Sequence, residues 1–217
     1  MISLPQSAMS SKSNPRLFSE DWTLTVPSHP GLEFVRLTPS YREIYYAFVA
    51  NPENTLHLNG PDSQGDEEQL AAARKRQVDR YAASTTKRNT IELLVLLDGK
   101  AVGRGGIVEI APNLANIGIQ LGREAQGRGL GRVTMQVLLR MSNEVEVDVI
   151  EAGTMKTNKA MRGLAASLGL QETDEQKIVP GRGVVAEVMY KNISVAKWKH
   201  YEVNIEFKGP AAEETEK

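Results

Sequence analysis

The chain has 217 residues, of which 41% are hydrophobic and 24% are charged, close to the average of soluble globular domains. This length predicts one large domain, or a domain with appendages, and the composition excludes collagen-like, low-complexity and wholly disordered chains. Lysine and arginine number 26 and aspartate and glutamate 27, so the net charge of -1 provides no general attraction for nucleic acid or an anionic membrane. The chain has no cysteine, which excludes disulfides, thiolate metal sites and cysteine nucleophiles.

The two ends differ from the middle of the chain. Residues 1–30 are rich in serine and proline and predict a flexible N-terminal extension that docks one short segment around Trp22 at most. This segment lacks the apolar core of a signal peptide, and the run Leu93–Leu97 is too short to cross a bilayer, so we expect a cytoplasmic protein. The folded domain is expected over residues 31–208, and residues 209–217 are expected to form a disordered tail.

The first half of the domain predicts helices followed by a strand meander. We expect a strand over 32–37, a helix from 38–40 to Phe48, a loop over 51–65 and a helix over 66–83. Strands over 91–97 and 101–110 are joined across Asp98-Gly99, a strong hairpin signal, and a further strand covers 116–121.

The second half alternates between helix and strand. Apolar residues recur at steps of three and four from Leu130 to Met141, which predicts an amphipathic helix. A strand over 145–151, a helix over 158–168 and a strand over 183–190 follow. Residues 201–207 alternate apolar and polar, and predict an extra strand whose apolar face is covered by its own sheet or by a second copy in a homodimer. This order of elements describes a mixed α/β domain built on one sheet.

The most informative segment combines a strand, a glycine-rich turn and a helix start between residues 119 and 131. Gly127, Gly129 and Gly131 let the backbone approach a ligand, and the N–H groups at a helix N-terminus form a pyrophosphate site. Arg123 and Arg128 could add positive charge. The alternative is a tight turn that binds nothing.

Two better-known phosphate-binding patterns do not match this segment. Arg132 stands where the dinucleotide fingerprint needs its third glycine. Arg-Gly follows Gly127 where the Walker A pattern needs Lys-Ser/Thr.

The pattern Gln126-x-x-Gly129-x-Gly131, between a strand and an amphipathic helix, resembles motif A of the GCN5-related N-acetyltransferases (GNAT superfamily). The segment from Asn158 to Gly169 resembles motif B of the same family. The likeness covers about 32–190 and is greater to the ribosomal-protein and bacterial protein-lysine branches than to histone enzymes. It implies a GNAT-type α/β fold with a mixed, mostly antiparallel central sheet flanked by helices, with acetyl-CoA as co-substrate.

The resemblance also implies roles for individual residues. Backbone groups of Ile119 and Leu121 would run beside the pantetheine arm, residues 126–131 would hold the pyrophosphate, and Asn158 would lie near the thioester end. Together with the two arginines of the turn, the expected cofactor-binding set is Ile119, Leu121, Arg123, Gln126, Gly127, Arg128, Gly129, Leu130, Gly131 and Asn158.

The chain departs from the family at two catalytic positions. Seven residues after Asn158, many members carry a tyrosine that protonates the thiolate, but this chain has Ala165. The strand before motif A lacks the glutamate that some members use. Glu109 is our candidate for the base that takes the ammonium proton, although a solvated carboxylate is the commoner role for such a residue. His57 is a weaker candidate.

The expected activity is direct transfer of the acetyl group of acetyl-CoA to a primary amine, with a small-molecule acceptor favoured over a protein N-terminus or lysine. A non-catalytic acyl-CoA-binding module is the alternative that Ala165 favours. Tyr41, Tyr45 and Tyr46 are core residues or line an acceptor pocket, and the acidic residues 62–68 cap a helix or attract a polycationic amine. His29, His57 and His200 are too scattered to predict a metal site.

Overall fold

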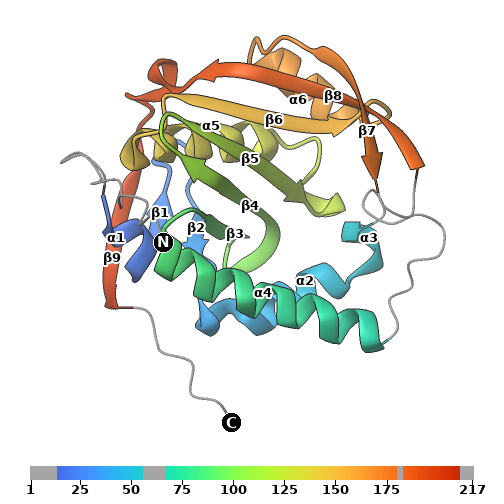
Figure 1. The fold of residues 1–217 in the computed structure, drawn as a ribbon. Helices are drawn as coiled ribbons and strands as arrows, with labels where there is room; N and C mark the ends of the chain where they lie inside the picture. Colours follow the sequence, from blue (N-terminus) through green and yellow to red (C-terminus); the bar gives the residue numbers. More distant parts are fainter. Residues whose placement is uncertain (1–13, 56–66, 180–182, 211–217) are drawn as a thin grey trace, which may run out of the picture.

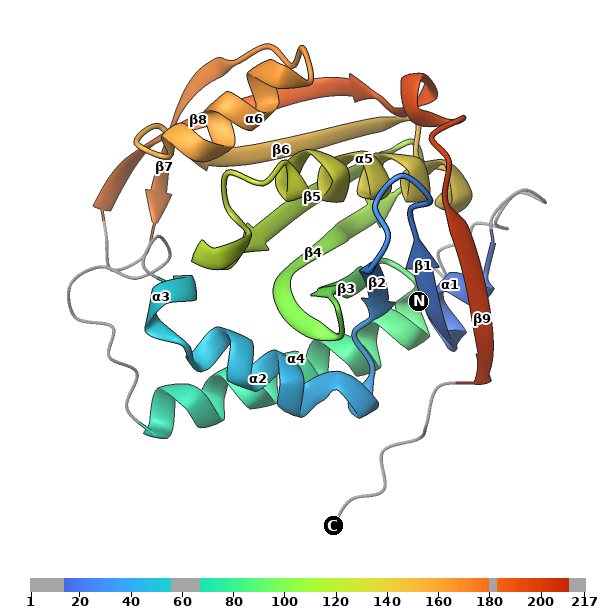
Figure 2. The same ribbon diagram turned by 180° about the vertical axis from the view of Figure 1, so that it is seen from behind.

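The computed structural model describes residues 14–55, 67–179 and 183–210, which are built around a sheet of nine strands (Figures 1 and 2). The strand order is β7-β8-β6-β5-β4-β3-β2-β1-β9. The strands are β1 (Glu20–Thr25), β2 (Leu32–Arg36), β3 (Ile91–Leu97), β4 (Lys100–Ala111), β5 (Leu114–Leu121), β6 (Val149–Met155), β7 (Thr173–Val179), β8 (Gly183–Ser194) and β9 (Asn204–Pro210). The α-helices are α1 (Arg16–Ser19), α2 (Arg42–Ala50), α3 (Pro52–Thr55), α4 (Glu67–Lys87), α5 (Leu130–Ser142) and α6 (Lys159–Ser167). Short 3₁₀ turns are η1 (Pro39–Tyr41), η2 (Arg123–Ala125), η3 (Asn143–Val145) and η4 (Val195–Trp198).

The pairing of β5 with β6 is parallel, whereas the other neighbouring strands in the sheet are antiparallel. It covers only three residue pairs, from Leu114 opposite Val149 to Asn116 opposite Glu151. Beyond Asn116, β5 continues to Leu121 beside β4 alone, so the two strands diverge (Figure 1). The gap between β5 and β6 therefore lies where the carboxyl-terminal part of β5 leads into the glycine-rich turn.

The larger core lies where α5 packs on the sheet. Met135, Leu138 and Leu139 of α5 are fully buried there, and Ala165 of α6 joins the same cluster. A smaller cluster, which is separate from this core, consists of Val35, Leu37, Leu94 and Leu96. Tyr41 of η1 and Tyr45 of α2 pack against it. Figure 1 shows α2 and α4 running together on the side of the sheet away from α6. None of the helices in the described ranges is both long enough and apolar enough to cross a membrane.

The mixed, mostly antiparallel sheet flanked by helices confirms the fold class expected from the sequence. The extra C-terminal strand is also present, although it covers 204–210 and not 201–207. One edge of β9 pairs with β1, and Ile205 and Phe207 on its apolar face are half-buried and pack against the core.

The structure also differs from the sequence expectation elsewhere. β9 includes residues 209 and 210, which were expected in the disordered tail. Residues 16–25 form α1 and β1. The segment around Trp22 that was expected to dock is buried, and Leu17 and Phe18 of α1 are buried as well, so more of the expected flexible extension is ordered than the one short segment. Residues 52–55 are helical and 173–179 form a strand. The strand expected over 145–151 is β6 at 149–155, because η3 extends α5 and Glu146 adopts a left-handed φ of 59°.

Candidate active site

A cavity of about 440 Å³ lies beside the divergent part of β5 and is called the loop cavity below. Its walls come from β5, the glycine-rich turn, the first turn of α5 and α6. The lining residues are Asn54, Ile119, Gln120, Leu121, Ala125, Gln126, Gly127, Gly129, Gly131, Arg132, Asn158, Ala160, Met161, Leu164 and Ser167.

Glycine is favoured at two positions of the turn because the backbone there is left-handed. Gly127 has φ +72° and Gly129 has φ +79°, and a Cβ added at either would meet no heavy atom within 4 Å. Within the described residues, the N–H groups of residues 127–131 donate to no backbone carbonyl. These donors lie at the positive end of α5, so the turn is suited to bind an anion.

The third glycine has a packing role. A Cβ on Gly131 would lie 3.3 Å from Leu164 and 3.5 Å from Leu121, so glycine allows α5, α6 and β5 to meet closely. Arg132, in the first turn of α5, donates to the carbonyl of Ser167 at 2.7 Å and joins α5 to the end of α6. Arg132 therefore adds a positive charge to the wall of the loop cavity.

Asn158 begins α6 and lies on the opposite wall. Its side-chain oxygen accepts from the N–H of Met161 at 3.1 Å, and its Nδ2 donates to Thr154 at 2.9 Å. The first bond caps the helix and the second ties the cap to β6. The orientation of this wall is therefore fixed by the cap.

A second network anchors α6 from outside the cavity. Arg162 on α6 donates to the carboxylate of Glu172, and the hydroxyl of Tyr190 on β8 donates to the same carboxylate at 3.0 Å. The bond from Arg162 lowers the pKa of Glu172. Burial, and next the bond to Glu172, raise the pKa of Tyr190 to about 12.

Ala165 does not face the loop cavity. Its side chain has 0% exposure and belongs to the main core, whereas Met161 and Leu164 on the same helix line the cavity. A tyrosine at this position would have to displace core side chains. Position 165 therefore presents no proton donor to the loop cavity.

A further cavity of about 270 Å³, called the strand cavity below, lies over β4 and β5. Glycine backbone forms part of its wall at Gly105, Gly106 and Gly118, while Glu92, Arg104 and Tyr45 contribute polar groups. Ile119 and Gln120 line this cavity and the loop cavity alike. β5 therefore joins the two cavities.

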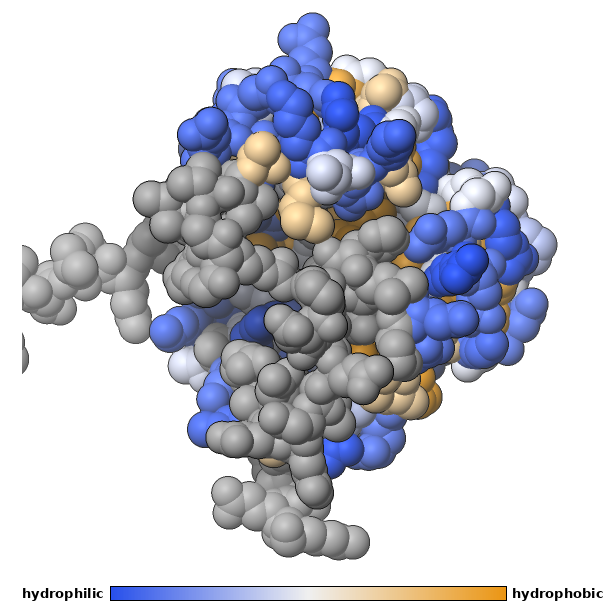
Figure 3. Space-filling model, turned by 90° about the vertical axis from the view of Figure 1, so that its right-hand side faces the viewer, coloured by the Kyte–Doolittle hydropathy of each residue, from blue (hydrophilic) through white to orange (hydrophobic). Residues whose placement is uncertain are grey.

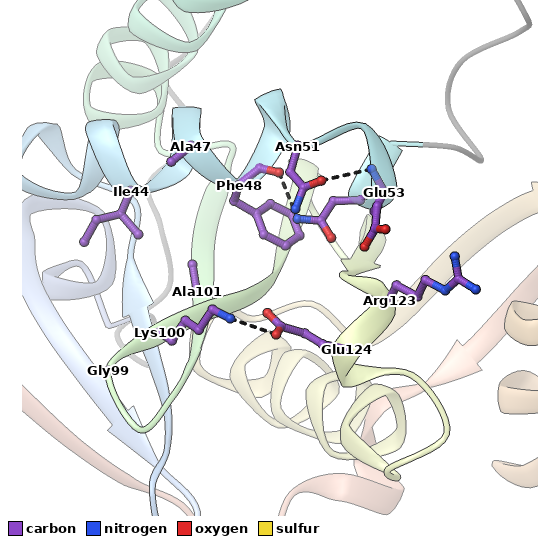
Figure 4. Close-up of a pocket in the computed structure, with 11 residues that line it drawn as sticks. Ile44, Ala47, Phe48, Asn51, Glu53, Gly99, Lys100, Ala101, Arg123 and Glu124 are labelled. Carbon is purple, nitrogen blue, oxygen red and sulfur yellow. Dashed lines mark hydrogen bonds and ion pairs between the residues drawn. The ribbon is translucent and has the colours of Figure 1, made fainter.

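The third cavity, between α2, α3 and η2, is drawn in Figure 4. Lys100 and Glu124 form an ion pair at 2.8 Å across it, and Arg123 points away from that pair (Figure 4). Asn54 lines this cavity as well as the loop cavity. Figure 3 looks at the side of the molecule on which α3 and β7 lie and shows apolar patches set among hydrophilic side chains.

The structure brings together most of the residues expected to bind the cofactor. Ile119, Leu121, Gln126, Gly127, Gly129, Gly131 and Asn158 all line the loop cavity. Arg123 lines the third cavity instead, Arg128 is exposed and lines none of the three, and Leu130 is buried at the start of α5.

The structure places Glu109 away from the three cavities. It is exposed, has φ 54° at an irregular part of the β4–β5 ladder, and accepts a hydrogen bond from Asn116. His57, Asp62 and Asp66 lie outside the described residues. Within the described ranges, no group of three or more histidines and carboxylates is placed to hold a metal ion.

The sequence analysis missed several polar residues of the cavity walls, among them Glu92, Arg104, Gln120 and Arg132. Arg132 could have been found from its place in the first turn of α5, on the side of the glycine-rich turn. Arg104 and Gln120 face each other across β4 and β5, with a bond of 2.7 Å from Nε to Oε1. The signal for Arg104 was an arginine among three glycines in a strand otherwise rich in apolar residues.

Comparison with known proteins identifies the fold and the family. The sequence profile of the acetyltransferase (GNAT) domain matches residues 32–171. A search of curated protein sequences gave no match. The chain belongs to the GNAT acetyltransferases, which are acetyl-CoA-dependent N-acetyltransferases, as the two sequence motifs indicated.

Solved structures with the same fold are distant in sequence. An acetyltransferase from Salmonella typhimurium that modifies the N-terminal serine of ribosomal protein L7/L12 is 15% identical, with a TM-score of 0.64, covering 78% of this chain and 98% of that one. The ribosomal-protein-S5-alanine acetyltransferase from Vibrio fischeri is 15% identical, with a TM-score of 0.64 and coverage of 78% and 96%. A chimera of the Vibrio cholerae spermidine N-acetyltransferase is 17% identical, with a TM-score of 0.56 and coverage of 78% and 99%.

Proposed function

We propose that this protein transfers the acetyl group of acetyl-CoA to the primary amine of a small molecule, with the cofactor in the loop cavity and the amine in the strand cavity. The observation that carries this assignment is the shared wall of the two cavities at Ile119 and Gln120. A cofactor along β5 on one side and an acceptor on the other would meet there.

The residues of the loop cavity suit acetyl-CoA in charge and in shape. The N–H groups of residues 127–131 and the guanidinium of Arg132 favour a pyrophosphate, and Met161 and Leu164 offer apolar contact to a pantetheine arm. The bound co-substrate would supply an activated acetyl thioester. The chain's own task is then to orient that group and to accept a proton from the amine.

Glu92 on β3 is the carboxylate of the strand cavity and is our proposed proton acceptor. Its side chain is 17% exposed, and it accepts from Arg80 at 3.1 Å. Glu109 was the candidate from the sequence, but its position outside the cavities favours Glu92. Either residue would take the proton directly or through a water molecule.

The size of the strand cavity favours a small acceptor. Its volume of about 270 Å³ lies just below the range of about 300–1,000 Å³ that is usual for drug-sized ligands. The solved relatives include proteins named for ribosomal-protein N-termini and one named for spermidine, so a protein N-terminus remains the second candidate.

A turnover assay that detects the released thiol of CoA tests the proposal. It uses the full chain with acetyl-CoA, a panel of small primary amines, and peptides with a free N-terminus or an internal lysine. Turnover with small amines supports the proposal, and turnover with peptides alone would assign a protein acceptor. Binding of acetyl-CoA by calorimetry without turnover on any arm would make the protein an acyl-CoA-binding module.

A further inference from the structure

The strand cavity contains a positive charge that its described neighbours leave unbalanced. Arg104 is half-buried on β4, and its guanidinium lies 5.6 Å from the ring centre of Tyr45. Its Nε donates to Gln120 at 2.7 Å and its Nη1 to the Tyr45 hydroxyl at 2.8 Å. Both acceptors are neutral, and Nη2 has no hydrogen-bond acceptor among the described residues.

The carboxylate of the same cavity does not provide this balance. Glu92 pairs with Arg80, and no ion pair joins it to Arg104 within the described ranges. Removing a guanidinium from water without a counter-ion is costly, whereas an arginine held in place by two neutral partners is ready to bind an oxyanion. Among the described residues, the negative charge of Glu92 is therefore paired with Arg80, whereas the positive charge of Arg104 has neutral partners alone.

The strand register places the two charges along one face of the sheet. Arg104 is opposite Leu94 and Gly106 is opposite Glu92. Glu92 on β3 and Arg104 on β4 therefore point to the same face, with an offset of two residues in the register. On β5, Gly118 is opposite Gly106 and Gln120 is opposite Arg104. A Cβ on Gly118 would meet no heavy atom within 4 Å, so this face of the sheet is open on β5, beside Gly106 and Gln120.

We propose that the amine acceptor carries a carboxylate, which Arg104 binds while the amine lies over Gly106 and Gly118, on the side of the cavity to which Glu92 belongs. This inference rests on the proposed function and narrows its substrate class from primary amines to small amino acids. Arg104 and Gly106 are two residues apart on β4, about 7 Å between their Cα atoms, so we expect a chain of a few carbons between the carboxylate and the amine. Arg104 is then a specificity-determining residue that touches the acceptor.

Three amines of matched length test the inference. γ-Aminobutyrate carries a carboxylate, γ-aminobutyramide replaces it with a neutral amide, and putrescine replaces it with a second amine. For the wild type we expect kcat/KM for γ-aminobutyrate to exceed the values for the amide and for putrescine by about 10- to 100-fold, as for a hydrogen-bonded charge pair.

Variants at Arg104 separate recognition from stability. Arg104→Gln should reduce the carboxylate-to-amide ratio to about one, and Arg104→Lys should restore part of it, because lysine keeps the charge without the planar fork. Arg16→Gln is the control. It removes an exposed arginine that pairs with Glu20 and does not line the strand cavity. Melting temperatures and acetyl-CoA affinities show whether each variant is folded and binds the co-substrate.

The outcomes distinguish this inference from the proposed function. Equal kcat/KM for the three amines in the wild type, or a preference for γ-aminobutyrate that survives in Arg104→Gln, would overturn the role of Arg104 and leave amine acetylation intact. Absence of thiol release with every amine, while acetyl-CoA still binds, would overturn the proposed function and this inference with it.

Discussion

Gly106 on β4 and Gly118 on β5 are opposite each other in the ladder, but a side chain would meet quite different surroundings at the two positions. A Cβ on Gly106 would lie 2.8 Å from the carbonyl oxygen of Ile91, whereas a Cβ on Gly118 would meet no heavy atom within 4 Å. Gly106 therefore leaves room for the backbone of β3, with which β4 pairs. Gly118 keeps the strand cavity open.

This difference predicts that substitution of Gly118 affects activity and that substitution of Gly106 affects stability. Gly118→Val should fold normally and bind acetyl-CoA with unchanged affinity, but its kcat/KM for the amine should fall about tenfold or more because the side chain fills the acceptor space. Gly106→Ala should lower the melting temperature instead. Calorimetry, thermal unfolding and the thiol assay measure the three quantities, and unchanged kcat/KM in Gly118→Val would remove the amine from this cavity.

The glycine-rich turn allows a test of anion binding with matched side chains. Asparagine and aspartate have nearly the same shape and both tolerate the left-handed backbone of Gly129, so they differ mainly in charge. Gly129→Asp should weaken acetyl-CoA binding by about 10- to 100-fold relative to Gly129→Asn, because its carboxylate would face the pyrophosphate. Equal affinities of the two variants by calorimetry would contradict a pyrophosphate site at this turn.

Two carboxylates compete for the role of proton acceptor, and paired substitutions separate them. We expect Glu92→Gln to reduce kcat about 100-fold, the usual contribution of a positioned base, while Glu109→Gln changes it less than about twofold. Glu92→Gln keeps a hydrogen-bond acceptor for Arg80, whose side chain is 55% exposed, so we expect little change in stability. A large effect of Glu109→Gln with none from Glu92→Gln would restore the residue first indicated by the sequence.

The raised pKa of Tyr190 predicts that the protein loses stability at alkaline pH. Burial and the bond to Glu172 raise its pKa from about 10 to about 12 in the folded protein. The contribution of Tyr190 to the free energy of unfolding is therefore complete below pH 10. It is lost between pH 10 and 12, because the unfolded chain then releases the proton that the folded chain keeps.

Urea unfolding at pH 9 to 12 measures this effect. In Tyr190→Phe, the free energy of unfolding should be lower at pH 9 because the bond to Glu172 is gone, and it should fall less steeply from pH 10 to 12 than in the wild type. Parallel curves for the two proteins over that interval would show that Tyr190 does not carry the alkaline transition.

The sequence predicted the elements in which local pattern and tertiary environment agree. Ile91–Leu97 reads as a buried strand and is one, and the apolar spacing from Leu130 to Met141 matches the buried face of α5. β7 was missed because Thr173–Val179 contains Asp174, Glu175 and Lys177, which resemble a polar loop. Its place in the sheet is set by pairing with β8, a contact that no local pattern encodes.

The same reasoning explains which parts of the site could be predicted. The turn from Gln126 to Gly131 is contiguous, so its glycines are visible in the sequence. The group of Tyr45, Arg104 and Gln120 joins α2, β4 and β5, and the first two are separated by 59 positions in the sequence. Such a group depends on strand register and helix packing, which the sequence does not show directly.

The antiparallel pairing of β1 with β9 determines how the protein should respond to mechanical force. Glu20 is opposite Pro210 at one end of this ladder, and Thr25 is opposite Asn204 at the other. Force applied at Glu20 and Pro210 would pull across the strands and not along them, so the hydrogen-bonded pairs would separate one after another. β9 should therefore peel away at low load, while β4, β5 and the cavities beside them, several strands farther into the sheet, remain folded.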